Sequence, residues 1–270
     1  MSIERTPATE LTQAARVNSV LWRPCESLEH ARERFAQWRD WHRAPWPYQA
    51  DESDEERVHD LIGAAWPCDE RWEFPEVWHP TLDRLGGRAL EVGRGSRGCN
   101  DADAKLGRLA WCLTRHLRPQ RVVETGVGRG FTTSVLLEAL ERNGAGHLWS
   151  IDLRPTVERG RQTEVGVVVP ERLRGRWTLL RGSSRRRLPG LLAELGGVDL
   201  FLHDSLHTSR NMRFELEQAW AGLGARAAAL VDDVHLNHAT GRFLQDHQEA
   251  SAVLSAADDG KVLIGCLARR

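Results

Sequence analysis

The sequence has almost no excess of charge of either sign. Its 37 lysine and arginine residues are balanced by 38 aspartate and glutamate residues, which leaves a formal net charge of −1 at pH 7. Proteins that bind nucleic acid usually carry a basic excess or a basic stripe. The composition therefore gives no reason to expect a nucleic-acid partner.

Long apolar runs and paired cysteines are also missing. No segment approaches the roughly 20 apolar residues that a transmembrane helix needs, and the N-terminal stretch MSIERTPATELTQAARV lacks the apolar core of a signal peptide. We therefore expect a soluble protein of the reducing cytoplasm, with no membrane partner. No cysteine belongs to a Cys-x-x-Cys pair, so neither a zinc site nor a disulfide framework is indicated. The five cysteines are Cys25, Cys68, Cys99, Cys112 and Cys266.

Tryptophan, by contrast, is concentrated near the N-terminus. Residues 1–85 are short for a core of their own. We therefore expect an accessory segment that forms a lid over the substrate or a contact in a homo-oligomer, and residues 86–270 form the main domain. Packing of the tryptophans against that domain is the plainer alternative. Helical spacing of apolar residues predicts a helix over Leu28–Trp41. Seven of the eleven tryptophans lie in this segment: Trp22, Trp38, Trp41, Trp46, Trp66, Trp72 and Trp78.

From about residue 105 onward, segments of strand and helix character alternate. Such alternation is typical of a parallel sheet that is covered by helices on both faces. The fold class is therefore α/β. The expected strands are Gln120–Glu124, His147–Asp152, Trp177–Arg181, Val198–His203 and Ala227–Val231, and the expected helices are Ala104–Leu117, Thr132–Asn143, Leu188–Leu195 and Asn211–Leu223.

The C-terminal segment has a different pattern. From Ser251 onward, two β-compatible runs are joined by Asp258-Asp-Gly-Lys261, and Asp-Gly is a favoured hairpin turn. The sequence therefore predicts a mostly parallel sheet that ends in an antiparallel hairpin. A dinucleotide-dependent dehydrogenase would instead continue with parallel strands.

The segment VVETGVGRGFTT, residues 122–133, joins a strand to a helix through three glycines at alternate positions, Gly126, Gly128 and Gly130. Glycine permits a sharp turn and a close approach of a ligand to the backbone, and the start of a helix adds free N–H groups. We expect this segment to be a cofactor loop. A similar run, Leu90–Gly98, has no buried strand before it and no apolar helix directly after it. We interpret that run as a loop near the entrance of the site.

An acidic residue ends the next predicted strand. Asp152 closes the run HLWSID, 22 residues after Gly130. In Rossmann-like folds a carboxylate at this position accepts hydrogen bonds from a ribose diol. Helix capping or a surface position is the alternative role for Asp152.

Together these segments resemble a bacterial family of class I S-adenosylmethionine-dependent methyltransferases. The branch that they are similar to contains macrolide-sugar O-methyltransferases, and catechol O-methyltransferases are more distant. The resemblance covers roughly residues 85–270 and implies a Rossmann-like class I methyltransferase fold, preceded here by a helical, Trp-rich accessory segment. It is carried by VVETGVGRGFTT, GHLWSIDL, VPERLRGRWTLLRGSSRRRLPGLL, VDLFLHDSLHTSRNMRFELEQAW and LVDDV.

The resemblance also implies roles for individual residues. Glu124 and Gly126 would line the methionine end of S-adenosylmethionine, and Asp152 would hold its ribose. Gly182 and Ser183 would lie beside the adenine.

Three aspartates follow two of the predicted strands. Asp204 comes after VDLFLH, and Asp232 and Asp233 come after AAALV. Ligands in open α/β sheets bind at the carboxyl ends of the strands, and three carboxylates that meet there repel one another unless a cation lies between them. A hard divalent ion such as Mg²⁺ suits such a set. In the O-methyltransferases that the chain resembles, acids at these positions hold Mg²⁺ or Ca²⁺. Capping of a following helix is the alternative for Asp232 and Asp233.

One position departs from the resemblance. The sugar-modifying relatives often have Asp-Gly-Asp after this strand, and the second aspartate is proposed as the base. This chain has Asp204-Ser-Leu206, and His207 follows. We expect His207 to replace the missing base, because an imidazole takes up protons near neutral pH. A structural histidine bonded to a carboxylate is the alternative.

These features predict a metal-assisted O-methyltransferase that acts on a hydroxylated small molecule, such as a sugar or a natural-product intermediate. Asp204 and His207 would act in catalysis. A metal-independent N-methyltransferase is the alternative enzyme. A non-catalytic scaffold that binds the cofactor is the alternative from another class.

Overall fold

The computed structural model describes residues 23–84, 102–153, 156–158 and 161–269. The predicted entrance loop, residues 90–98, lies outside this set. None of the helices in the described ranges is long and apolar enough to span a bilayer.

The chain forms two compact units, residues 1–43 and residues 44–270. The described part of the first unit contains helix α2 (Arg23–Trp41), which confirms the helix predicted over Leu28–Trp41. All other described elements belong to the second unit.

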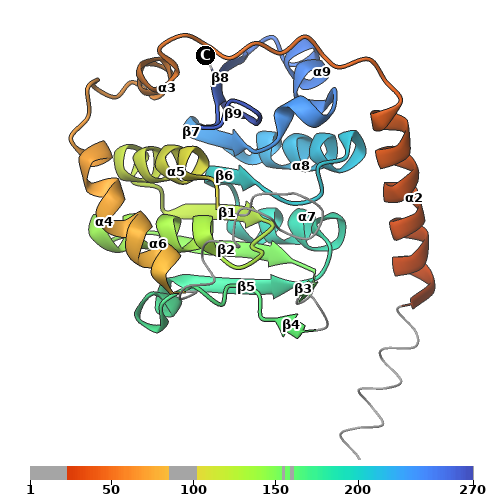
Figure 1. Ribbon diagram of the computed structural model, residues 1–270, viewed down its shortest axis with the longest axis horizontal. Helices are drawn as coiled ribbons and strands as arrows, with labels where there is room; N and C mark the ends of the chain where they lie inside the picture. The colour runs from red at the N-terminus through yellow and green to blue at the C-terminus, as the bar shows by residue number, and fades with distance from the viewer. Residues whose placement is uncertain (1–22, 85–101, 154–155, 159–160, 270) are drawn as a thin grey trace, which may run out of the picture. The chain divides into compact units, whose positions relative to one another are not determined.

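The second unit is built on a seven-stranded sheet (Figure 1) with the order β5-β2-β1-β6-β7-β9-β8. The first five of these strands are parallel to one another. Strand β9 is antiparallel to β7 and to β8, which confirms the predicted C-terminal hairpin. The strands are β1 (Arg121–Thr125), β2 (His147–Asp152), β5 (Trp177–Arg181), β6 (Val198–His203), β7 (Leu223–Val231), β8 (Ala250–Ala256) and β9 (Leu263–Arg269). A separate two-stranded sheet consists of β3 (Thr156–Glu158) and β4 (Arg161–Thr163).

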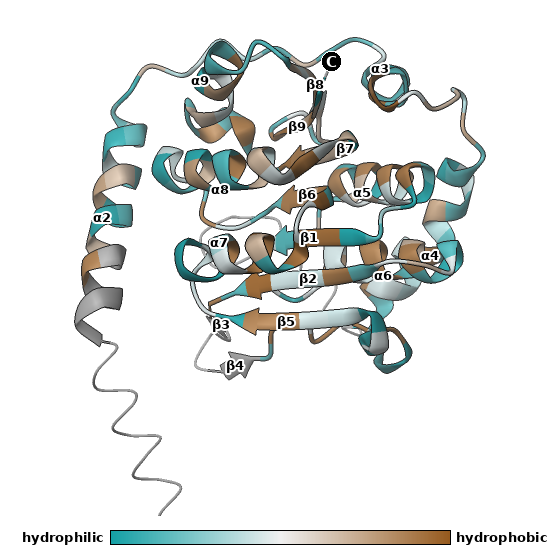
Figure 2. Ribbon diagram, turned by 180° about the vertical axis from the view of Figure 1, so that it is seen from behind, coloured by the Kyte–Doolittle hydropathy of each residue, from teal (hydrophilic) through white to brown (hydrophobic). Residues whose placement is uncertain are grey.

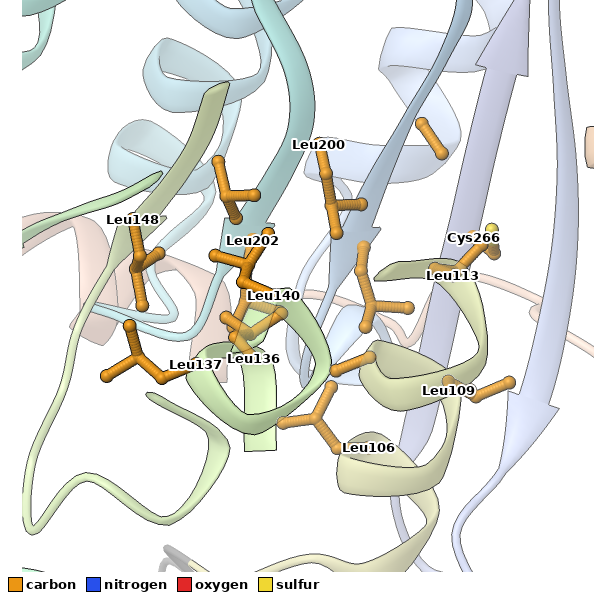
Figure 3. Packing of buried hydrophobic residues seen from close by; sticks show 14 of the residues in the cluster. Leu106, Leu109, Leu113, Leu136, Leu137, Leu140, Leu148, Leu200, Leu202 and Cys266 are labelled. Atoms are coloured by element: carbon orange, nitrogen blue, oxygen red, sulfur yellow. The ribbon is translucent and has the colours of Figure 1, made fainter. Parts of the chain in front are cut away.

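Helices cover both faces of the sheet. Alternate strand residues point to opposite sides, and both sets are apolar here, so each face packs against helices. Val122 and Leu200 pack into one apolar cluster, whereas their neighbours Val123 and Phe201 pack into another. Figure 3 shows leucines of α5 and α6 meeting strand residues in the first cluster. Hydrophobic colour accordingly covers much of the central strands, while the helices carry both kinds of residue (Figure 2). The helices on the first face are α5 (Ala104–Leu117) and α6 (Phe131–Asn143), and those on the second are α7 (Ser184–Leu195), α8 (Ser209–Gly222) and α9 (Ala239–Asp246).

Part of the Trp-rich segment packs on this same unit. The ring of Trp46 lies so close to Gly241 of α9 that a Cβ there would come within 2.2 Å of it. Trp78 is buried against Phe131 of α6, with 6.3 Å between the ring centroids, whereas Trp72 is exposed. Helices α3 (Asp54–Ile62) and α4 (Glu70–Asp83) lie in this segment. The plainer expectation for the tryptophans is thus confirmed for Trp46 and Trp78.

Candidate active site

The sheet brings the predicted site residues to one edge. Five parallel strands end at this edge, and Thr125 of β1 is in register with His203 of β6, which is in register with Val231 of β7. The next residues along β6 and β7 are Asp204 and Asp232. Neighbouring strand ends therefore hold the glycine loop and both acidic segments side by side.

The glycine loop needs glycine for steric reasons. Gly126 has a φ of +84°, and a Cβ on it would lie 1.8 Å from the carbonyl oxygen of Asp204. Gly130 has a φ of +92°, and a Cβ there would lie 2.8 Å from Cα of Gly166. At Gly128, by contrast, no described atom lies within 4 Å of the position that a Cβ would occupy. The loop is thus packed at both ends and open in the middle.

Asp152 holds this loop in shape. One of its carboxylate oxygens accepts hydrogen bonds from the backbone N–H groups of Val127, over 2.8 Å, and Gly128, over 3.1 Å. Its own carbonyl accepts a hydrogen bond from the N–H of Gly182, and Ser183 then stands at the N-terminus of α7. The predicted ribose and adenine residues are thus neighbours of the loop.

Glu124 lies beneath the loop rather than at its surface. Its side chain is buried and is hydrogen-bonded to the hydroxyls of Thr133, over 2.9 and 3.0 Å, and Ser150, over 2.6 Å. Burial is the main reason that the pKa of Glu124 is raised to about 8, and the charge of Asp152 adds to it. The fold therefore favours the protonated form of the Glu124 carboxyl.

Three side chains converge beside the loop. One atom each of Asp204, His207 and Asp232 can be chosen so that all lie within 4.8 Å of one another. Asp232 is buried, and its Oδ1 has no hydrogen-bond partner among the described residues. Burial and the charges of Asp204 and Asp233 raise its pKa well above the usual value. Negative charge is therefore concentrated in this cluster, and a bound cation would reduce the repulsion between its carboxylates.

Asp233, the third residue of the predicted metal-binding trio, is adjacent to this cluster but contacts His207. Its Oδ2 lies 2.9 Å from Nδ1 of His207, and it adopts a left-handed backbone conformation, with a φ of +55°. Burial alone would lower the pKa of His207, but the hydrogen bond and the charge of Asp233 raise it. The structure thus joins Asp233 to the predicted base, a contact that matches the alternative considered for His207, a histidine bonded to a carboxylate.

A second polar network, not predicted from the sequence, lies below the cluster. Glu215 of α8 is fully buried and accepts hydrogen bonds from His203 Nδ1, over 2.6 Å, Thr125 and Ser205. Burial would raise the pKa of Glu215, but the charge and hydrogen bond of His203 outweigh it and lower the pKa to about 2. The sequence held one indication that Glu215 is buried: it lies one turn after Met212, on the apolar face of α8.

Comparison with known proteins finds a family match that spans the glycine loop and the acidic segments. Residues 123–234 match a family described as a methyltransferase domain. The chain has no significant sequence match among the curated proteins.

Solved structures share the fold at low sequence identity. They include a putative O-methyltransferase from Klebsiella pneumoniae, with 18% identity, coverage of 81% of this chain and 100% of that one, and a TM-score of 0.51. The cofactor-bound protein Rv0187 from MTB has 20% identity, coverage of 83% and 99%, and a TM-score of 0.53. An O-methyltransferase from Bacillus cereus in complex with SAH has 14% identity, coverage of 80% and 97%, and a TM-score of 0.52. These likenesses confirm the predicted Rossmann-like fold.

Proposed function

We propose that this chain, whose residues 123–234 match a methyltransferase domain, is an S-adenosylmethionine-dependent methyltransferase that methylates a hydroxyl oxygen of a small molecule. The observation that carries the proposal is the cluster of Asp204, His207 and Asp232, which lies next to the glycine loop. A hydroxyl is a poor nucleophile until its proton is removed. This cluster contains a candidate base, His207, and two carboxylates, Asp204 and Asp232, that could hold a cation. A neutral amine, by contrast, already has a nucleophilic lone pair and does not need a metal ion to make it reactive.

The cofactor is held, in this proposal, by the loop and its neighbours. The open middle of the loop at Gly128 lets a ligand approach the backbone. Asp152 lies at the end of β2 with its second carboxylate oxygen available for the ribose, while Gly182 and Ser183 border the adenine. Glu124 stabilises the methionine end from below, as a buried polar group bonded to Thr133 and Ser150.

The cluster fits a divalent cation. The unpartnered Oδ1 of Asp232 and the nearby Asp204 supply the oxygen ligands that Mg²⁺ prefers, so these two residues would hold the ion. When bound, such an ion supplies polarisation of the acceptor oxygen. Asp233 takes a different part in this proposal, because it is already bonded to His207.

His207 removes the acceptor's proton. Its Nδ1 donates to Asp233, so the lone pair of the neutral ring is on Nε2, which is 3.8 Å from Asp204 Oδ1 and has no hydrogen-bond partner among the described residues. A base held by a carboxylate on its far nitrogen is the usual arrangement for proton transfer. The remaining work of the enzyme is to orient the oxygen toward the methyl group, which is already activated by the sulfonium.

The test is a transfer assay with labelled S-adenosylmethionine and a panel of hydroxylated sugars and phenols, with matched amines as the comparison set. Labelled product from hydroxyl acceptors, lost in Asp232→Asn, supports the proposal. Product from the amines alone, at a rate unchanged in Asp232→Asn, would establish the metal-independent N-methyltransferase instead. Cofactor binding without transfer to any acceptor would favour a scaffold.

A further inference from the structure

A second group of metal-ligating side chains lies outside the candidate active site. His59 of α3, Cys68 in the turn before α4, and Cys112 and His116 of α5 come together from three separate segments. Cys112 and His116 are four residues apart on one helix and therefore share a face. None of these four residues belongs to the cluster at the ends of β6 and β7.

The distances within this group suit tetrahedral metal coordination. Sγ of Cys68 lies 3.9 Å from Sγ of Cys112. Zinc–sulfur bonds of about 2.3 Å at the tetrahedral angle place two sulfurs about 3.8 Å apart. A ring nitrogen of His59 lies within 4.8 Å of both sulfurs, and a ring nitrogen of His116 lies within 4.8 Å of the Cys68 sulfur.

The ring of His59 is oriented as a ligand. Its Nδ1 is 2.6 Å from the carbonyl oxygen of Glu55, and since a carbonyl can only accept, Nδ1 carries the proton. Nε2 therefore keeps its lone pair. The residue is only 1% exposed, and Nε2 has no hydrogen-bond partner among the described residues. A second ring nitrogen bonded to a backbone carbonyl is the arrangement that orients metal-ligating histidines.

His116 supplies a matching nitrogen. Its Nε2 is buried and also lacks a hydrogen-bond partner within the described part of the chain. The rings of His59 and His116 meet edge to face, with 5.0 Å between centroids. Glu70 stands at the rim, with its Oε2 3.7 Å from His116 Nε2. Two unpartnered buried ring nitrogens beside two buried sulfurs are costly unless something binds them.

We propose that His59, Cys68, Cys112 and His116 bind one Zn²⁺ ion in a closed structural site. Thiolate and imidazole ligands select zinc over magnesium, and two thiolates neutralise the charge of the ion. The site would tie α3 and the turn before α4 to α5, which packs directly on the sheet. Eight residues separate His59 from Cys68, and three separate Cys112 from His116. This spacing contains no Cys-x-x-Cys pair, which is why no zinc site was expected from the sequence.

The experiment measures zinc directly in the full-length protein. The chain is purified under reducing conditions without added metal, and its zinc content is determined for the wild type, Cys68→Ser, His116→Gln and Cys266→Ala. Cys266 is the matched control, because it is a buried cysteine of β9 outside this group (Figure 3). The expected result is about one zinc per chain in the wild type and in Cys266→Ala, and loss of most of it in the other two. Asp204→Asn should also keep its zinc.

A second measurement does not depend on the variants folding. Cobalt(II) added to the metal-free wild type should give the intense visible absorption of tetrahedral coordination with sulfur ligands, and zinc should abolish it. Failure of the wild type to bind either metal, at micromolar concentrations and with free thiols, would overturn the proposal. A Cys68–Cys112 disulfide found by mass spectrometry in protein purified under reducing conditions would also overturn it, since it would make the pair a redox couple.

Discussion

Nδ1 of His207 lies 2.9 Å from Oδ2 of Asp233, and the other ring nitrogen of His207 lies 3.8 Å from Oδ1 of Asp204. His207, in the segment that follows β6, is thus linked to Asp233 in the segment that follows β7. One of these acids orients the ring, and the other marks the place where the acceptor oxygen is expected.

Replacement of His207 by Gln should lower kcat by roughly 10²–10⁴, the usual loss when a general base is removed. The Kd for S-adenosylmethionine should be unchanged, because the ring does not form part of the cofactor loop. Asp233→Asn should also lower kcat, since the His207 ring loses its charged partner. His79→Gln, an exposed histidine on α4, is the control. Wild-type turnover in His207→Gln would exclude its role as base.

Comparison of Gly126→Ala with Gly128→Ala should separate the effect of a steric clash of the new Cβ from the effect of backbone strain. Both residues have a positive φ, of +84° and +52°, so alanine is strained at either position, by roughly 1 kcal/mol. Only at Gly126 does the new Cβ meet backbone, at 1.8 Å from Asp204 O. We expect Gly126→Ala to lose cofactor binding and to melt several degrees below Gly128→Ala. Calorimetry and thermal melting of both proteins provide the measurement, and equal behaviour would contradict the packing described for the loop.

Asp152→Ala should weaken the binding of S-adenosylmethionine by at least tenfold. Removal of the carboxylate takes away the proposed partner of the ribose and leaves the N–H groups of Val127 and Gly128 without their acceptor. Asp152→Asn keeps one acceptor oxygen and should therefore lose less affinity. Isothermal titration of the three proteins tests this order, and an affinity in Asp152→Ala equal to that of the wild type would remove Asp152 from the site.

The stability of the cofactor-free protein should depend on Glu124. Its pKa is about 8 in the folded chain, against an ordinary value of 4.5 for a solvated glutamate, so the unfolded state releases this proton first as the pH rises. The contribution of Glu124 to stability is therefore full below about pH 4.5 and is lost between that pH and about 8, with at most about 1.4 kcal/mol per unit of pKa shift.

Glu124→Gln removes this dependence. Its free energy of unfolding relative to the wild type should therefore improve steadily from pH 5 to pH 8. Glu194→Gln, at an exposed position of α7, should follow the wild type at every pH. Denaturant unfolding at several pH values makes the comparison. Parallel curves for the wild type and Glu124→Gln would show that Glu124 does not bind its proton more tightly in the folded chain.

Much of the sheet could be predicted from the sequence, because its strands are short apolar runs between turn signals. The bounds of β2, β5 and β6 agree with the prediction to the residue, as do those of α5. Helix α7 begins at Ser184 rather than at the expected Leu188, because its first turn consists of polar residues that carry no apolar period. Helix α4 was not predicted, since Pro75 and Pro80 stand inside it.

Only the part of the site that lies directly at the strand ends could be predicted from the sequence. The positions of Asp204 and Asp232 follow from the sheet order, but the choice of Asp233 as the partner of His207 depends on a left-handed backbone turn that no local pattern encodes. Glu215 and the His59–Cys68 group were missed for a related reason. Their partners come from segments far apart in the chain, and only the packed fold brings them together.

The central claim is that Asp204 and Asp232 hold a divalent cation that takes part in O-methylation, and one kinetic measurement tests it. Methyl transfer to the best hydroxyl acceptor is followed in the wild type before chelation, in excess EDTA, and after removal of EDTA and addition of Mg²⁺, with the Kd for S-adenosylmethionine measured in each state. The account predicts that chelation abolishes turnover, that Mg²⁺ alone restores it, and that the Kd changes less than twofold. Restoration by Mg²⁺ without zinc separates this site from the proposed zinc site. Full turnover in excess EDTA would contradict the account.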